Sequence, residues 1–318
     1  MEYQGSDRKT MYGETCELAG LPFYMHPWWL DIVCSSGIWD VLFSTSNDGQ
    51  VQAVFPFFLT RYRATRAIIN PLFTPHLGIY YLPKYKPSNP TKSFSWENNV
   101  CSELIKALPG HGYFQMKFHS SFQNWLPLRW LGFRQSTLYT SVLYPETPDS
   151  IFKKFSKGLQ QDIRKAENYL TLRTDAPFEI FLDLNIKTFK YQGKTKPYDT
   201  RLVKKIDQVL AGRDLRKIYT AYNINDPVAS IYIVRDKNKH IYLMSGQDRS
   251  SYSRGAVSML LWHAIQDAFK QSKLFDFEGS NLQGVQSFFM RFSPEQVPYF
   301  QIQRFTSIAS RFVFIDKR

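Results

Sequence analysis

The sequence predicts a mixed α/β (α+β) protein of two domains, each with a mixed, largely antiparallel sheet flanked by helices. At 318 residues the chain exceeds the size at which one hydrophobic core usually stops growing. Hydrophobic residues make up 43% and aromatic residues 16% of it, which is typical of an ordered globular protein. Strand-like and helix-like patterns alternate in both halves, so we expect domains at residues 1–147 and 148–318.

The first half begins with a short helix and a hairpin. Residues 26–34 (HPWWLDIVC) indicate a helix, with Pro27 suited to its first turn. Residues 39–45 and 51–60 are β-branched and aromatic runs, and the Asn-Asp-Gly between them favours a hairpin. Beyond them we expect a strand at 66–70, a Pro-rich loop at 83–90, a helix at 96–108 and strands at 112–118 and 137–144.

The second half reads as helices, an antiparallel meander, a helix and a returning strand. Residues 255–270 place Leu260, Leu261, Ala264, Ile265 and Ala268 on one apolar stripe of a helix. Around this helix we expect helices at 148–157, 159–169, 179–191 and 201–210, strands at 217–223, 227–235 and 240–245, and a buried strand at 274–277.

The two halves echo each other near their ends. In each, a strand leads into an aromatic stretch and then another strand, and Phe118 and Phe133 have the same spacing as Phe277 and Phe292. The shared order of elements indicates two related domains.

The net charge of +13 lies almost entirely in the second half. Residues 1–150 carry 12 Lys and Arg against 11 Asp and Glu, whereas residues 151–318 carry 28 against 16. Such a field favours an anionic partner, whether carrier phosphates, nucleic acid or a membrane surface, although a solvated helical face explains it equally well.

Other features limit the compartment and the chemistry. Three cysteines without paired spacing suggest neither disulfides nor zinc, and none of the six histidines has metal-ligand spacing. No signal pattern or membrane-spanning stretch is evident, so we expect a cytoplasmic protein that needs no metal.

Several segments resemble the tandem acetyltransferase-fold proteins of the GNAT superfamily that are related to the Fem-type (FemAB-like) peptidoglycan bridge aminoacyltransferases. They are the basic stretch 155–167, the run 242–246 followed by Gly255-Ala256, and Phe275-Asp276-Phe277-Glu278-Gly279-Ser280 with its downstream aromatics. The resemblance implies a bacterial transferase with two GNAT domains, the second of which carries the acyl-donor site.

One position departs from the family. Bridge aminoacyltransferases usually carry a Lys in the helix after the strand-end motif, where this chain has Phe289. This departure argues against dependence on aminoacyl-tRNA.

The turn from Arg249 to Ala256 is the candidate donor site. It keeps only part of the acetyltransferase phosphate loop, with Arg249 or Arg254 as a phosphate ligand and Gly255 and Ala256 opening the helix. Ser245 and Gly246 precede it. An ordinary polar turn that caps a helix remains the alternative.

The catalytic candidates follow from the needs of acyl transfer to an amine. Glu278, at a strand end, is the candidate base, although a structural turn carboxylate is the alternative. Tyr252 is a candidate proton donor to a leaving thiol, and His119 is the positional counterpart of Glu278. The substrate-contact candidates are His76, Asp276, Ser280 and Phe289.

Three functions stay open. The first is an N-acyltransferase that moves an acyl group from acetyl-CoA or another acyl-CoA to a small-molecule amine, a sugar amine or a cell-envelope precursor. The second is an aminoacyl-tRNA-dependent transferase that contacts tRNA through the basic second half. The third is a non-catalytic binding protein for an anionic ligand. Neither the acceptor nor the oligomeric state follows from the sequence.

Overall fold

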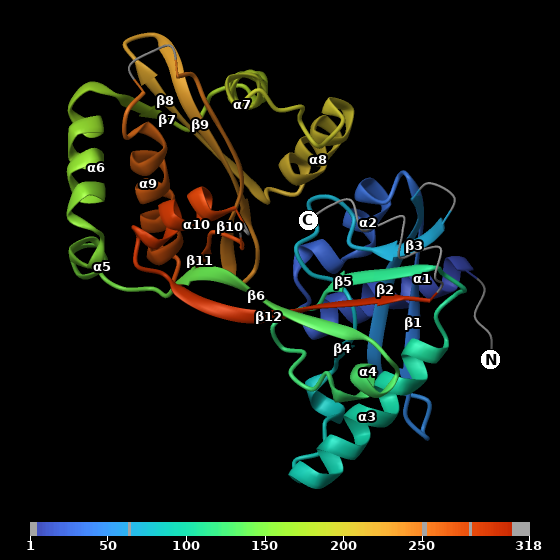
Figure 1. Cartoon of the computed structure of the whole chain (residues 1–318). Coiled ribbons are helices and arrows are strands. Elements are labelled where there is room, and N and C mark those ends of the chain that lie inside the picture. The colour runs from blue at the N-terminus through green and yellow to red at the C-terminus, as the bar shows by residue number, and fades with distance from the viewer. Residues whose placement is uncertain (1–4, 63–64, 250–252, 280–281, 307–318) are drawn as a thin grey trace. The chain divides into compact units, whose positions relative to one another are not determined.

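The computed structural model describes residues 5–62, 65–249, 253–279 and 282–306. It divides the chain into two compact units (Figure 1). Unit 1 combines Met1–Leu138 with Pro298–Arg318, and unit 2 is Tyr139–Val297. The expected second domain extends to residue 318, whereas here the segment from Pro298 groups with the first unit.

Unit 1 contains the predicted short helix and the hairpin that follows it. It contains α1 (Gly5–Ala19), η1 (Phe23–Met25), α2 (Pro27–Val33), β1 (Gly37–Thr45), β2 (Val51–Tyr62), β3 (Thr65–Ile69), β4 (Tyr80–Tyr81), η2 (Pro83–Tyr85), α3 (Pro90–Lys106), β5 (Tyr113–Lys117) and α4 (Leu126–Trp130). Helix α3 begins earlier than predicted, because Asn89 caps it by accepting from the N–H of Lys92 and Pro90 fits its first turn. Helix α1 is not among the predicted elements.

The sheet of unit 1 has the order β1-β2-β3-β5-β12. Neighbouring strands are antiparallel except for β3 and β5, which run parallel. Its core is aromatic, with Trp29, Phe55, Phe114 and Phe118 each fully buried. The sheet is therefore mixed and largely antiparallel, as expected.

Unit 2 contains the predicted helices, meander and returning strand. Its elements are α5 (Pro148–Lys154), α6 (Lys157–Tyr169), β7 (Thr171–Arg173), α7 (Phe178–Tyr191), α8 (Thr200–Gly212), β8 (Arg216–Asn223), β9 (Asp226–Arg235), β10 (Lys239–Gln247), α9 (Ala256–Lys270), β11 (Leu274–Asp276) and α10 (Gln283–Met290). Strands β6 (Arg134–Leu143) and β12 (Glu295–Phe305) each contribute residues to both units.

The two units exchange their last strands. The element orders β5-α4-β6 and β11-α10-β12 match, and the four aromatics at the predicted spacing are buried, namely Phe118, Phe133, Phe277 and Phe292. Strand β6 leaves unit 1 and pairs with β11, whereas β12 leaves unit 2 and pairs with β5. This exchange explains why the segment after Pro298 groups with unit 1.

Helices cover both faces of the sheet in unit 2 (Figure 1). Along β9, Ile231 and Ile233 belong to the hydrophobic core that includes the buried faces of α6 and α9. Tyr232 points the other way: its ring lies 5.3 Å from that of Phe181 in α7, and its hydroxyl donates to Asp207 in α8. The period of two along a strand thus places α6 and α9 on one face and α7 and α8 on the other.

His240 is fully buried in β10. It is 0% exposed, and neither ring nitrogen has a hydrogen-bond partner in the described part of the chain. Burial, reinforced by the nearby cations Lys273 and Arg235, lowers the pKa of His240 to about 4. The folded protein therefore holds this imidazole neutral.

We predict that stability falls in acid partly through His240. The unfolded chain takes up the proton below pH ~6.5 and the folded chain only near pH 4, so stability drops as the pH falls between these values, by about 2 to 3 kcal/mol. Urea unfolding of the wild type and of His240→Phe across this range measures it. Parallel stability profiles for the two proteins would contradict the assignment.

Candidate active site

Strand β11 pairs with only the first three residues of β10. Their parallel pairing ends at Ile241 and Asp276. Beyond this point the chain after β11 stays with β6, since the N–H of Phe277 donates to the carbonyl of Ser141 at 2.9 Å. Strand β10 continues beside β9 as far as Gln247. The second half of β10 therefore has an edge that β11 does not cover.

A bulge lies just after the point of separation. Tyr242 pairs with Ile233 and Met244 pairs with Tyr232, so Leu243 has no partner in β9. A bulge adds one residue to a strand and re-aims its local backbone, and bulges are common beside active sites.

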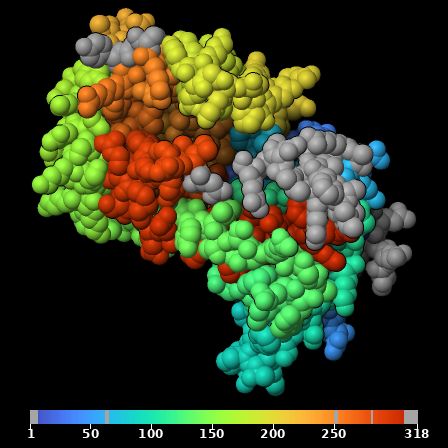
Figure 2. All heavy atoms as spheres, viewed as in Figure 1, coloured from blue at the N-terminus to red at the C-terminus, as the bar shows by residue number. Residues whose placement is uncertain are grey.

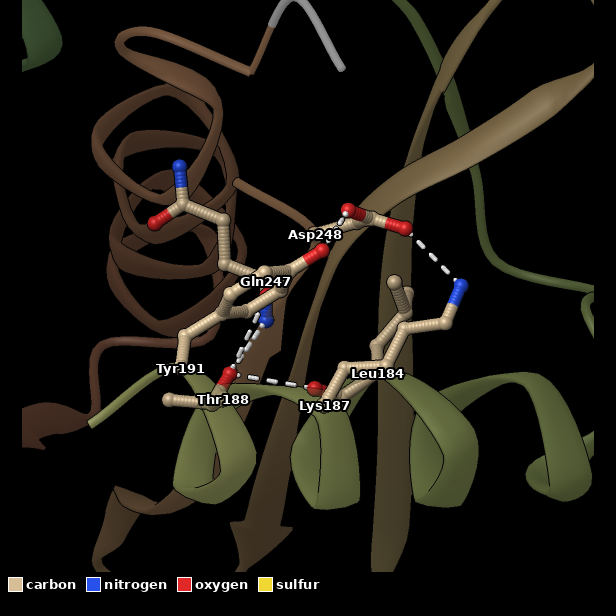
Figure 3. A network of polar contacts seen from close by, with 6 residues as sticks. All are labelled: Leu184, Lys187, Thr188, Tyr191, Gln247 and Asp248. Carbon is tan, nitrogen blue, oxygen red and sulfur yellow. Dashed lines mark hydrogen bonds and ion pairs between the residues drawn. The ribbon is translucent and has the colours of Figure 1, made fainter. Parts of the chain in front are cut away.

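Helix α7 packs directly against the last residues of β10 (Figure 3). Asn185 Nδ2 donates to the carbonyl of Ser245 at 2.5 Å, and the N–H of Gln247 donates to Thr188 Oγ1 at 2.8 Å. A Cβ at Gly246 would lie 2.2 Å from the backbone nitrogen of Asn185. Gly246 is thus required by this helix–strand approach, whatever else it contacts.

Asp248, the first residue after β10, is a buried carboxylate held by α7 (Figure 3). Lys187 Nζ lies 2.8 Å from its Oδ2, and the Tyr191 hydroxyl donates to its Oδ1 at 2.9 Å. The hydrogen bond that Lys187 donates to the Asp248 carboxylate raises the pKa of Lys187, which therefore stays charged near neutral pH. These contacts fix the direction in which the chain leaves the sheet.

The far end of the following loop is fastened at the start of α9. Gln247 Nε2 donates to the carbonyl and to Oγ of Ser253 at 3.0 and 2.8 Å. Gly255 takes the N-cap position of α9 with φ of 78°. A Cβ there would lie 2.5 Å from the carbonyl oxygen of Asp162 in α6, so the position needs glycine. Gly255 has no side chain to cap the first N–H groups of α9.

Arg249 and Arg254 belong to this loop and are exposed. Arg254 Nε lies 3.7 Å from Asp162 Oδ1, and the side chain of Arg254 is 86% exposed. The other carboxylate oxygen of Asp162 accepts from Arg291 at 2.6 Å. Because an exposed ion pair is weak, Arg254 can turn toward an anion at little cost.

Asp276 is a structural carboxylate at the end of β11. It is 3% exposed and accepts from Thr140 Oγ1 at 2.6 Å and from Lys239 Nζ at 2.7 Å. The N–H of Glu278 donates to it at 2.9 Å. A buried charge needs such partners, and here protein groups supply all three. Asp276 thus supports the strand ends of the site.

Glu278 follows Asp276 in an unusual conformation. Its φ of 58° lies in the left-handed region, which non-glycine residues rarely adopt, and its Oε1 is buried. Backbone strain of this kind clusters at functional sites. Because of this backbone conformation, Glu278 does not continue the alternation of side chains between the two faces of β11.

Phe289 lies in an aromatic cluster of unit 2. Its ring centroid is 5.1 Å from that of Phe277 and 5.9 Å from that of Tyr242, and burial raises the pKa of Tyr242 to about 12. Where the resemblance would place a lysine, the chain therefore has a core side chain.

His76 and His119 come together in unit 1. Their ring centroids are 5.8 Å apart, and the ring of His76 lies 4.5 Å from that of Tyr299. The Tyr24 hydroxyl is 3.4 Å from His76 Nδ1. These histidines belong to an aromatic cluster of unit 1, whereas Glu278 belongs to unit 2.

Tyr252 and Ser280 lie outside the described residues. Among the residues that the structure describes, no three His, Cys, Asp or Glu side chains gather as a metal site would require. A search of the same residues found no helix long and apolar enough to cross a bilayer.

Residues 153–283 match the family model described as an acetyltransferase (GNAT) domain. Unit 2 carries a GNAT domain. The matched stretch includes β10, the loop after it, α9 and the end of β11, so it covers the candidate site from Ser245 to Glu278.

Solved structures share the fold of almost the whole chain. FemX has a TM-score of 0.66 at 10% identity, over 95% of this chain and 96% of its own. A tandem GNAT protein from the clavulanic acid biosynthesis pathway has a TM-score of 0.53 at 10% identity, over 94% of this chain and 95% of its own. L-PGS from Bacillus licheniformis has a TM-score of 0.51 at 11% identity, over 86% of this chain and 87% of its own. At these identities the likeness shows the fold, and it confirms the predicted tandem GNAT-like architecture. A search of the curated proteins found no match.

The α7 side of the candidate site is not predicted from the sequence. Lys187 and Tyr191 stand one helical turn apart, and Asp248 follows 61 positions after Lys187, so no local pattern connects them. The available signal is Gly246, because a glycine inside a strand often marks a close backbone approach.

We predict that Gly246→Ala destabilises the protein by more than about 3 kcal/mol, because its Cβ would meet the backbone of α7. Gly212→Ala, at the end of α8 with no atom within 4 Å of its Cβ, is the matched control and should change stability by less than about 1 kcal/mol. Urea unfolding compares them. Equal stability of the two variants would show that the backbone of α7 does not approach β10 this closely at Gly246.

Proposed function

We propose that the GNAT domain of unit 2 transfers an acyl group from acetyl-CoA or another acyl-CoA to an amine. The observation that carries the proposal is the separation of β10 from β11, followed directly by a fastened loop and the N-terminus of α9. These elements supply a backbone edge and a helix N-terminus within one stretch of chain.

The donor would be held by two kinds of group. The pyrophosphate fits the N-terminus of α9, where backbone N–H groups and the helix dipole favour negative charge. Arg249 and Arg254 add positive charge at the same loop. Gly255 and Ala256 have little or no side chain, so a phosphate could approach the backbone there, as the resemblance to acetyltransferases implies. Ser245 and Gly246 act indirectly, through their packing on α7.

We propose that the edge of β10 between its pairing with β11 and its contacts with α7 polarises the acyl carbonyl. Pairing with β11 ends at Ile241, and the side chains of α7 engage Ser245 and Gln247. Leu243, at the bulge, lies between these supports. A fixed backbone N–H at this position would stabilise the oxyanion that forms when an amine attacks.

Glu278 is our proposed base. The amine nitrogen bonds to the acyl carbon and passes a proton to this carboxylate, the carbon–sulfur bond breaks, and the thiolate leaves and is then protonated. Tyr252 stays a prediction for the last proton. His76, His119, Ser280 and Phe289 have no direct role in this scheme, and the acceptor class remains an amine of a small molecule, a sugar or an envelope precursor.

The basic helices α5 and α6 favour a second candidate donor. Their exposed cations Lys153, Lys154, Lys157, Arg164 and Lys165 form a field suited to a nucleic acid. An aminoacyl-tRNA-dependent transfer would show transfer from charged tRNA and tRNA binding that weakens steeply with salt. Ligand binding without turnover on any amine would instead indicate a binding protein.

We predict that CoA binds to the purified protein and that Arg249→Gln weakens this binding about three- to ten-fold, through loss of charge at the helix N-terminus. Arg213→Gln is the control. This exposed arginine lies between α8 and β8, and the start of β8 pairs with the end of β9, whereas the candidate loop follows the end of β10 that pairs with the start of β9. Titration calorimetry with CoA measures both. Absence of CoA binding in the wild type would reject the proposed donor.

We predict that Glu278→Gln lowers kcat about 100-fold or more while the Kd for CoA stays within about two-fold. Glu295→Gln, an exposed carboxylate of β12, should leave both unchanged. Thiol release from acetyl-CoA with a panel of amino sugars, amino acids and diamines measures turnover. An unaltered steady-state rate in Glu278→Gln would remove this residue as the base.

A further inference from the structure

The middle of the first half is strongly basic, although its overall charge is balanced. Between residues 49 and 145 the sequence has ten Lys and Arg but only two acidic residues, Glu97 and Glu103. Glu97 forms an ion pair with Lys86 at 2.7 Å, and Glu103 accepts a hydrogen bond from Ser44. Glu97 is thus paired with a cation, Glu103 is exposed, and residues 49–145 carry a formal net charge of +8.

Helices α3 and α4 carry an exposed apolar patch in the same region. Trp130 is 63%, Phe94 43% and Leu126 37% exposed. The rings of Phe94 and Trp130 lie 6.5 Å apart, and Leu126 and Trp130 are one turn apart on α4, so the three side chains are contiguous. We call these three residues the aromatic corner. Figure 2 shows the teal and green atoms of α3 and α4 at the surface.

Exposed cations lie close to the aromatic corner in the sequence. Lys92 stands two positions before Phe94, and Arg129 stands directly before Trp130 with its guanidinium 5.9 Å from the ring of Trp125. Arg134 follows in the exposed start of β6. Tryptophan, phenylalanine and leucine close to an excess of Lys and Arg are typical of surfaces that enter the headgroup region of an anionic membrane.

We propose that the aromatic corner docks unit 1 on the surface of an anionic lipid bilayer. The three side chains would enter the interface between headgroups and acyl chains, and Lys92, Arg129 and Arg134 would contact lipid phosphates. No spanning helix is needed for such binding. This docking is independent of the transfer activity proposed for unit 2.

The size of the aromatic corner favours a bilayer over a second protein. Its exposed apolar area is on the order of 300 Å², from the exposed fractions of one tryptophan, one phenylalanine and one leucine. A stable protein interface buries about 800 Å² on each partner. A few interfacial side chains together with basic charge are, in contrast, enough for reversible membrane binding.

The test is flotation of the full chain with vesicles of phosphatidylcholine alone or mixed equally with phosphatidylglycerol. We expect binding to the mixed vesicles only. Phe94→Ser/Trp130→Ser should weaken it about ten-fold or more, and Lys92→Gln/Arg129→Gln should weaken it and reduce its salt dependence. Leu18→Ser/Ile38→Ser is the matched control, since these unit 1 side chains are 90% and 69% exposed, and it should bind as the wild type does.

Three results would overturn the proposal. They are absence of wild-type binding to the mixed vesicles, equal loss in the control pair, and unchanged binding in Phe94→Ser/Trp130→Ser. If sedimentation shows self-association that the aromatic substitutions abolish, and no vesicle binds, the aromatic corner belongs to an interface between two copies. Thermal unfolding of each variant separates lost binding from lost folding.

Discussion

One buried carboxylate holds the candidate site in shape. Asp276 joins β11 to β6 through Thr140 and to β10 through Lys239, at the last register position where β10 and β11 still pair. An uncompensated charge at 3% exposure would be strongly destabilising, so these strands stay together here. Their separation immediately afterwards is therefore sharp. The contacts of α7 with Gly246 and Asp248 then fix the end of the β10 edge that β11 does not cover.

Local patterns predict most of this fold, because periods of two and 3.6 depend on short stretches of chain. The apolar stripe of α9 and the β8-β9-β10 meander are confirmed for this reason. Helix α1 is different: it is mostly polar, and tertiary packing buries Tyr12 and Cys16. The clamp between Lys187 and Asp248 and the pairing of β12 with β5 depend on contacts between distant segments, which no local pattern reveals.

Glycine and aromatic residues in the site show why residue type alone assigns roles poorly. Gly255 is the residue that a phosphate loop would use, yet the carbonyl of Asp162 already demands it. Phe289 stands where the Fem-type resemblance implies lysine, and it packs on Phe277 in the core of unit 2. Packing and ligand contact place similar demands on these positions, so only the surrounding contacts distinguish them.

The exchange of β6 and β12 ties the two halves together during synthesis. Strand β5 has its partner β12 only after residue 305 has left the ribosome, so unit 1 cannot complete its sheet while the rest of the chain is still being made. Unit 2, in turn, takes strand β6, which pairs with β11, from the segment before its own helices. If the gene were divided between the two halves, each fragment would encode a domain that lacks one of its strands. The two domains therefore depend on each other for complete sheets.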